Sequence, residues 1–151
     1  MLGYDIEQYK RDSYYLGAII GRYAGRIAEG KFSLNGMECQ FGLNDGDHHL
    51  HGGPIGFNRK LWQYRTFENM DGVSLQLITT SADGEEGFPG QLDVKVVYTL
   101  NDNNELSVSY DAVSTKSTLV NLTQHLYFNL AGHSQGSILG HQMQIKSNNY
   151  L

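Results

Sequence analysis

The chain has 151 residues, with 11 basic and 16 acidic side chains and a formal net charge of −5. An acidic chain without a basic run is poorly suited to binding nucleic acid or an anionic membrane surface. Its apolar runs are too short to span a bilayer, and no signal-peptide pattern is visible. The single cysteine, Cys39, excludes an internal disulfide and a cysteine-based zinc site. We therefore expect a globular protein in the cytoplasm.

Apolar residues alternate with a period of two along most of the chain, which is typical of half-buried strands. Only residues 6–11 have spacing that would suit a short helical turn. Asn35-Gly36 separates two alternating runs and predicts a β-hairpin with a type I′ turn, which needs positive φ at both central residues. Alternation at Val73, Leu75 and Leu77 predicts a further strand.

The longest alternation covers residues 92–100, and a second one at 106–112 follows an Asn/Asp-rich turn. This pattern predicts a second hairpin. Shorter strands are expected near 120–122 and 143–145. The chain is therefore predicted to be all-β, an antiparallel β-sandwich in a single domain spanning residues 1–151.

Three glycine-rich segments, residues 16–30, 44–56 and 81–90, do not follow a strand pattern. Loops of this kind on a β scaffold are where binding and catalytic groups usually lie. The second contains His48-His49-Leu50-His51, and His49 and His51 would share one face of an extended segment. Such imidazoles are either simply solvated or part of a site. A metal site is disfavoured because no acidic residue follows closely.

His125 is a second candidate, on a segment that places it beside Thr123, Tyr127 and Asn129. A histidine among such neighbours can act as an acid or base near neutral pH, or be a structural residue bonded to a carbonyl. Arg26 can bind hydroxyls or carboxylates with its planar guanidinium, or be an ordinary surface residue.

Glu85 and Glu86 are adjacent, so their side chains diverge and cannot form the facing pair of a glycosidase. A solvated turn is the favoured interpretation for these two glutamates.

Four motifs along the chain resemble those of the aldose 1-epimerases, in the order found in that family. They are IGRYAGRI at 20–27, LHGGPIGF at 50–57, SADGEEGFPG at 81–90 and NLTQHLYFNLAG at 121–132. The resemblance implies a galactose mutarotase-like β-supersandwich, here incomplete. It also implies an isomerase that interconverts the α and β anomers of free aldoses, such as galactose and glucose, by opening and reclosing the ring.

The resemblance also implies roles for single residues. His125 matches the general acid of the family. His51 matches a second histidine that holds the sugar and polarises the region of its ring oxygen, and Arg26 matches an arginine that binds sugar hydroxyls. Neither a metal nor a cofactor is required by this chemistry, whose partner is a monosaccharide.

The chain departs from the family pattern in two ways. Gly25 stands where the family usually has asparagine, which removes one sugar contact. Family members are roughly twice as long, and their general base, a glutamate, lies beyond the region that matches. We therefore expect a fragment or truncated form, inactive or severely impaired alone, whose unpaired strand edges favour association, for example as a homodimer.

Two other hypotheses remain open. The missing base favours a non-catalytic carbohydrate-binding or interaction module of the same fold. A metal-dependent β-barrel enzyme using His49, His51 and His125 is the other. An epimerase acting on hexose 6-phosphates is disfavoured because no basic cluster is present to bind phosphate.

Overall fold

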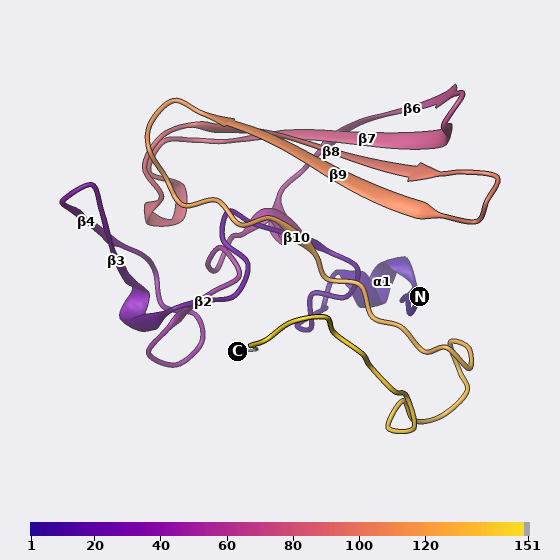
Figure 1. Cartoon of the computed structure of the whole chain (residues 1–151). Coiled ribbons are helices and arrows are strands. Elements are labelled where there is room, and N and C mark those ends of the chain that lie inside the picture. Colours follow the sequence, from indigo (N-terminus) through magenta and orange to yellow (C-terminus); the bar gives the residue numbers. More distant parts are fainter. Residues whose placement is uncertain (150–151) are drawn as a thin grey trace. The chain divides into compact units, whose positions relative to one another are not determined.

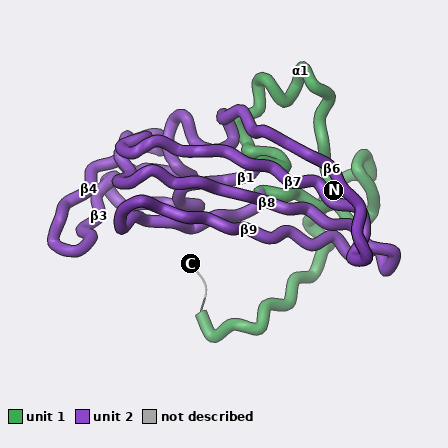
Figure 2. The backbone as a smooth tube through the Cα atoms, turned by 90° about the horizontal axis from the view of Figure 1, so that it is seen from above, with its two compact units in different colours: residues 1–18, 125–151 green, residues 19–124 purple. Residues whose placement is uncertain are grey.

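The computed structural model describes residues 1–149 as an assembly of mainly antiparallel strands (Figure 1). Two compact units are distinguished along the chain: residues 1–18 with the segment from residue 125 onward, and residues 19–124 (Figure 2). No helix within residues 1–149 is long and apolar enough to cross a membrane. The elements are α1 (Ile6–Tyr9), β1 (Ile19–Ile20), β2 (Arg26–Ile27), η1 (Ala28–Gly30), β3 (Lys31–Leu34), β4 (Met37–Gln40), β5 (His49–Leu50), η2 (Phe57–Arg59), β6 (Gln63–Asn69), β7 (Gly72–Ser81), η3 (Glu85–Gly87), β8 (Leu92–Leu100), β9 (Leu106–Ser114) and β10 (Thr123–Gln124).

The largest sheet is an antiparallel meander in the order β6-β7-β8-β9, and Figure 1 shows these four strands side by side. Leu77, Val96 and Tyr110 lie opposite one another across β7, β8 and β9. This register places the alternating apolar residues on one face, as the period of two predicts. The buried cluster on that face consists of Ile19, Phe57, Leu92, Val94 and Val96.

Both predicted hairpins are confirmed. β3 and β4 pair with Leu34 opposite Met37, and the two linking residues, Asn35 and Gly36, have φ values of 52° and 79°. Positive φ at both positions is what a type I′ turn requires. The strands β8 and β9 form the second hairpin around the loop 101–105.

Other sequence-based expectations differ from the structure. The strand expected near residues 143–145 is absent from the described chain, and Met143 and Ile145 are exposed there. β6 was not expected, and the glycine-rich segments contain the short strands β1, β2 and β5. The antiparallel all-β fold itself is confirmed, and the predicted helical turn is present as α1.

Candidate functional site

Two short antiparallel strands place Arg26 and His51 on neighbouring backbone segments. β2 pairs with β5 so that Arg26 lies opposite Leu50. Beyond this pair, the backbone N–H of His51 donates to the carbonyl of Gly25 at 3.0 Å. Arg26 directly follows Gly25, so two of the predicted site residues are fixed on neighbouring backbone segments of the same compact unit.

The ring of His51 is oriented by a second bond to the same glycine. The backbone N–H of Gly25 donates to Nδ1 of His51 at 3.0 Å. An Nδ1 atom that accepts a hydrogen bond is unprotonated, so the proton of the neutral ring lies on Nε2. This arrangement gives His51 a defined tautomer with Nε2 as its hydrogen-bond donor.

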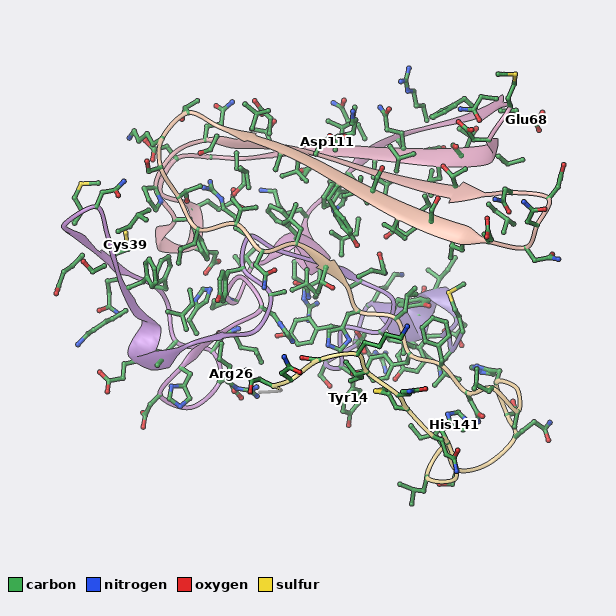
Figure 3. All side chains as sticks on the ribbon, in the orientation of Figure 1. Tyr14, Arg26, Cys39, Glu68, Asp111 and His141 are labelled. Carbon is green, nitrogen blue, oxygen red and sulfur yellow. The ribbon has the colours of Figure 1, made fainter. Side chains whose placement is uncertain are left out.

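Arg26 lies at the surface, where its side chain is labelled in Figure 3. Its Nε is 2.7 Å from Oδ2 of Asp45, and 60% of the arginine side chain is exposed. Asp45 is held in the turn before β5 by backbone bonds to His48. An exposed ion pair contributes little to stability, so this contact chiefly orients the guanidinium.

His49 lies in a different environment from His51. Its side chain is fully buried and lies against the rings of Phe41 and Phe88, with centroids 5.3 and 5.4 Å away. Its Nδ1 donates to the carbonyl of Gly42 at 2.7 Å, since a carbonyl can only accept. His49 is therefore built into the core. Within residues 1–149, no group of three or more His, Cys, Asp or Glu side chains could hold a metal ion.

Burial makes His49 a source of acid sensitivity. Desolvation lowers the pKa of this imidazole below its ordinary value of 6.5, against smaller opposing effects of Gly42 and Glu86. In the folded protein the ring therefore stays neutral at a pH where the unfolded chain binds a proton. Stability falls as the pH drops from about 6.5 toward the depressed pKa, with a slope approaching ~1.4 kcal/mol per pH unit for one proton.

His49→Gln is expected to remove this contribution, since glutamine does not titrate. Urea unfolding of both chains between pH 5 and 7 measures it. The exposed His48→Gln variant is the matched control and should retain the slope of the wild-type chain. An unchanged slope in His49→Gln would contradict the assignment.

His125 belongs to the other compact unit. Its backbone N–H donates to Ala18 at 2.8 Å, and its carbonyl accepts from Gly17 at 2.9 Å. The imidazole lies near the rings of Tyr15 and Tyr127, with ring centroids 5.9 and 5.1 Å away. The predicted grouping with Tyr127 is therefore present, and both backbone bonds of His125 go to the segment before β1.

Arg22, the residue with the largest fully buried side chain, was not predicted as a site residue. Its five N–H groups donate to five oxygens, all within the loop 81–90, at 2.6–3.2 Å. The acceptors are Ser81 Oγ and the carbonyls of Ser81, Ala82, Pro89 and Gly90. Burial lowers the pKa of this guanidinium, an effect opposed by Glu85 and Asp83. Arg22 thus anchors the acidic loop at both ends.

The interpretation of Glu85 and Glu86 as a solvated turn is not supported by their contacts. Glu85 forms a half-buried ion pair with Lys60, whose Nζ is 2.7 and 2.8 Å from its two carboxylate oxygens. Glu86 accepts a hydrogen bond from the backbone N–H of Ile55 at 3.0 Å. The two side chains diverge as expected, since Glu86 binds the turn that follows His51 and Glu85 binds Lys60.

These features define an antiparallel β protein that carries acid–base and hydrogen-bonding groups on glycine-rich loops. The family model described as aldose 1-epimerase matches residues 1–151. The chain belongs to the aldose 1-epimerase family.

Similar proteins include the galactose mutarotase of Bos taurus, 45% identical over 152 residues, with 100% of this chain and 43% of the relative covered. The aldose 1-epimerase of Haemophilus influenzae is 41% identical and is covered over 44% of its length. The galactose 1-epimerase crystal structure from Lactobacillus acidophilus matches 83% of this chain and 38% of its own, with a TM-score of 0.78 and 36% identity. This chain therefore spans less than half the length of these relatives.

Proposed function

We propose that this chain serves the interconversion of the α and β anomers of free aldoses such as galactose and glucose. The observation that carries the proposal is the pair of bonds between Gly25 and His51, which gives His51 an Nε2–H donor. Such a donor can bind and polarise the ring oxygen of a sugar. Arg26 would bind hydroxyl groups through its guanidinium.

His125 is proposed as the general acid. Ring opening needs a group that protonates the ring oxygen while a base removes the anomeric proton, and a histidine can hold that proton near neutral pH. The contacts of His125 with Tyr15 and Tyr127 hold the ring and support this role. Family membership is the second support for the proposal.

A titration with galactose tests the binding part of the proposal. The ring nitrogens of His51 and His125 are expected to shift in nitrogen-15 NMR spectra. His51→Ala should weaken binding about tenfold, the effect of losing one good hydrogen bond. His48→Ala is the matched control, because His48 is exposed and its side chain accepts a hydrogen bond from the backbone N–H of Glu29. Equal affinities of the two variants would contradict the role of His51.

Exchange between the two anomers of galactose, followed by polarimetry or NMR, tests catalysis. If the chain accelerates this exchange and His125→Ala removes the acceleration, the result supports a catalytic function. Binding without acceleration favours the second candidate, a non-catalytic carbohydrate-binding module, for this chain. No residue here has been matched to the family's glutamate base, which is the specific reason for keeping that candidate.

Two further properties are proposed for the chain. A cytoplasmic location is one of them, and the thiol of Cys39 is compatible with a reducing compartment. Association of two chains is supported by the edge strands β6 and β9, which end the four-stranded sheet. Analytical ultracentrifugation measures the second property directly.

A further inference from the structure

In the acidic loop 81–90, the carboxylate of Glu86 contacts the turn that carries His51. Oε1 of Glu86 accepts a 3.0 Å hydrogen bond from the backbone N–H of Ile55, a residue 31 positions earlier in the chain. We propose that Glu86 is the positioning residue of His51, acting as a hydrogen-bond acceptor that fixes the turn 51–55. This inference rests on the role proposed above for His51 in binding sugar.

The turn is shaped to admit this carboxylate. Gly53 has a φ of +97°, and a Cβ added to it would lie 2.3 Å from Oε2 of Glu86. The carboxylate therefore occupies the space that a side chain at position 53 would take. The backbone N–H of Gly53 donates to Leu50 at 3.0 Å, which closes the turn around His51. A missing side chain on one loop and a carboxylate from another thus fit together.

Glu86 is itself held in place from several sides. The following residue, Gly87, packs its backbone so closely on β4 that a Cβ there would lie 2.3 Å from the carbonyl oxygen of Gln40. Arg22 binds both ends of the loop through five hydrogen bonds.

His51 needs such support because its backbone has a φ of +55°. That conformation is unfavourable for a residue with a side chain and persists where the surroundings determine it. Gly25 holds His51 from one side through two hydrogen bonds. Glu86 holds the other end of the turn at Ile55. Without this acceptor the turn can relax, and the bond from Gly25 to Nδ1 of His51 weakens.

Three variants test the proposal in the whole chain. Glu86→Met keeps the length of the side chain and removes the acceptor, whereas Glu86→Gln keeps a carbonyl oxygen for Ile55. Glu85→Gln is the matched control, since it changes the neighbouring carboxylate, which binds Lys60. The measurements are the ring nitrogen shifts of His51 in the free protein and the Kd for galactose.

In Glu86→Met we expect the shifts of Nδ1 and Nε2 in His51 to move toward each other as both tautomers become populated. We expect the Kd for galactose to rise about tenfold, the loss of roughly one hydrogen bond. Glu86→Gln and Glu85→Gln should retain the wild-type shifts and stay within about twofold of the wild-type Kd. Rescue by glutamine would identify the acceptor, and not the charge, as the positioning group.

Wild-type shifts of His51 in Glu86→Met would overturn the proposal, as would a glutamine variant that behaves like methionine. If Glu86→Met does not fold, hydrogen exchange of the wild-type chain decides. The amides of Ile55 and Gly25 should then show equal protection factors, and unequal ones reject the coupling. A wild-type chain that does not bind galactose, with shifts that still respond to Glu86→Met, would reject the proposed function and leave the positioning role intact.

Discussion

Arg22→Met is expected to destabilise the chain by about 3–5 kcal/mol. The substitution leaves five oxygens of the loop 81–90 without their donors, most of them buried. A buried acceptor that loses its partner costs ~1–3 kcal/mol, and loss of a buried network is among the few causes of large effects. Because a domain is stable by only ~5–15 kcal/mol, urea unfolding should show a strongly lowered midpoint.

Two variants make this prediction specific. Lysine has three donors and no planar fork, so Arg22→Lys should recover part of the lost stability without reaching the wild-type value. Arg65→Met is the matched control, because Arg65 is exposed and its side chain donates to Gln76 and lies over the ring of Phe67. It should change stability by less than about 1 kcal/mol. Equal effects of Arg22→Met and Arg65→Met would contradict the anchoring role of Arg22.

The hairpins could be predicted because local residues determine them. Asn35-Gly36 takes the positive φ values of a type I′ turn without help from distant residues. The alternation of residues 92–100 likewise marks its own buried face, where Val94 and Val96 are almost fully buried.

β6 could not be predicted from the same pattern. It is an edge strand with little buried surface, and Tyr64 is 76% exposed, so its apolar residues do not mark a core face. The turn Met70-Asp71 with Gly72 after it was the available signal. The alternation at Met143 and Ile145 shows the opposite case, a strand-like pattern without a paired strand in the described chain.

The arginines of the first motif show why site residues are harder to predict than strands. Arg22 and Arg26 are four positions apart in one glycine-rich segment, yet one is 2% exposed and the other lies at the surface. The buried pair Ile19-Ile20 before Arg22 was a signal that this part of the segment enters the core. The acceptors of Arg22 lie about 60 residues further along the chain, which no local pattern identifies.

The acidic loop illustrates the same limit. Adjacent carboxylates in a glycine-rich segment suggest that both side chains are exposed to solvent, as long as only the loop itself is considered. Glu85 and Glu86 instead bind Lys60 and the Ile55 backbone, 25 and 31 positions earlier. The loop therefore acts as a support for the His51 turn, which adds a structural role to a motif first noted only for its family resemblance.

Gly52→Ala is the second substitution for which we expect a large effect. It should lower the free energy of unfolding by about 3 kcal/mol or more. A Cβ at Gly52 would lie 1.7 Å from the carbonyl oxygen of Gly21, and its φ of +88° is strained for alanine. The same oxygen accepts the backbone N–H of Phe57 at 3.2 Å, and Phe57 is 2% exposed, so the displacement would reach the core. Backbone atoms cannot move aside as a flexible side chain can.

Gly46→Ala separates this collision from the cost of the backbone conformation. Gly46 lies in the same glycine-rich segment with a φ of +58°, and a Cβ there would have no atom within 4 Å. Gly46→Ala should lower the free energy of unfolding only by the ~1–2 kcal/mol that a left-handed backbone conformation costs a residue with a side chain. Urea unfolding of both variants measures the difference, and galactose titration of Gly52→Ala should show weakened binding because the residue follows His51. If the two variants were equally stable, the close approach of Gly52 to Gly21 would not support the site.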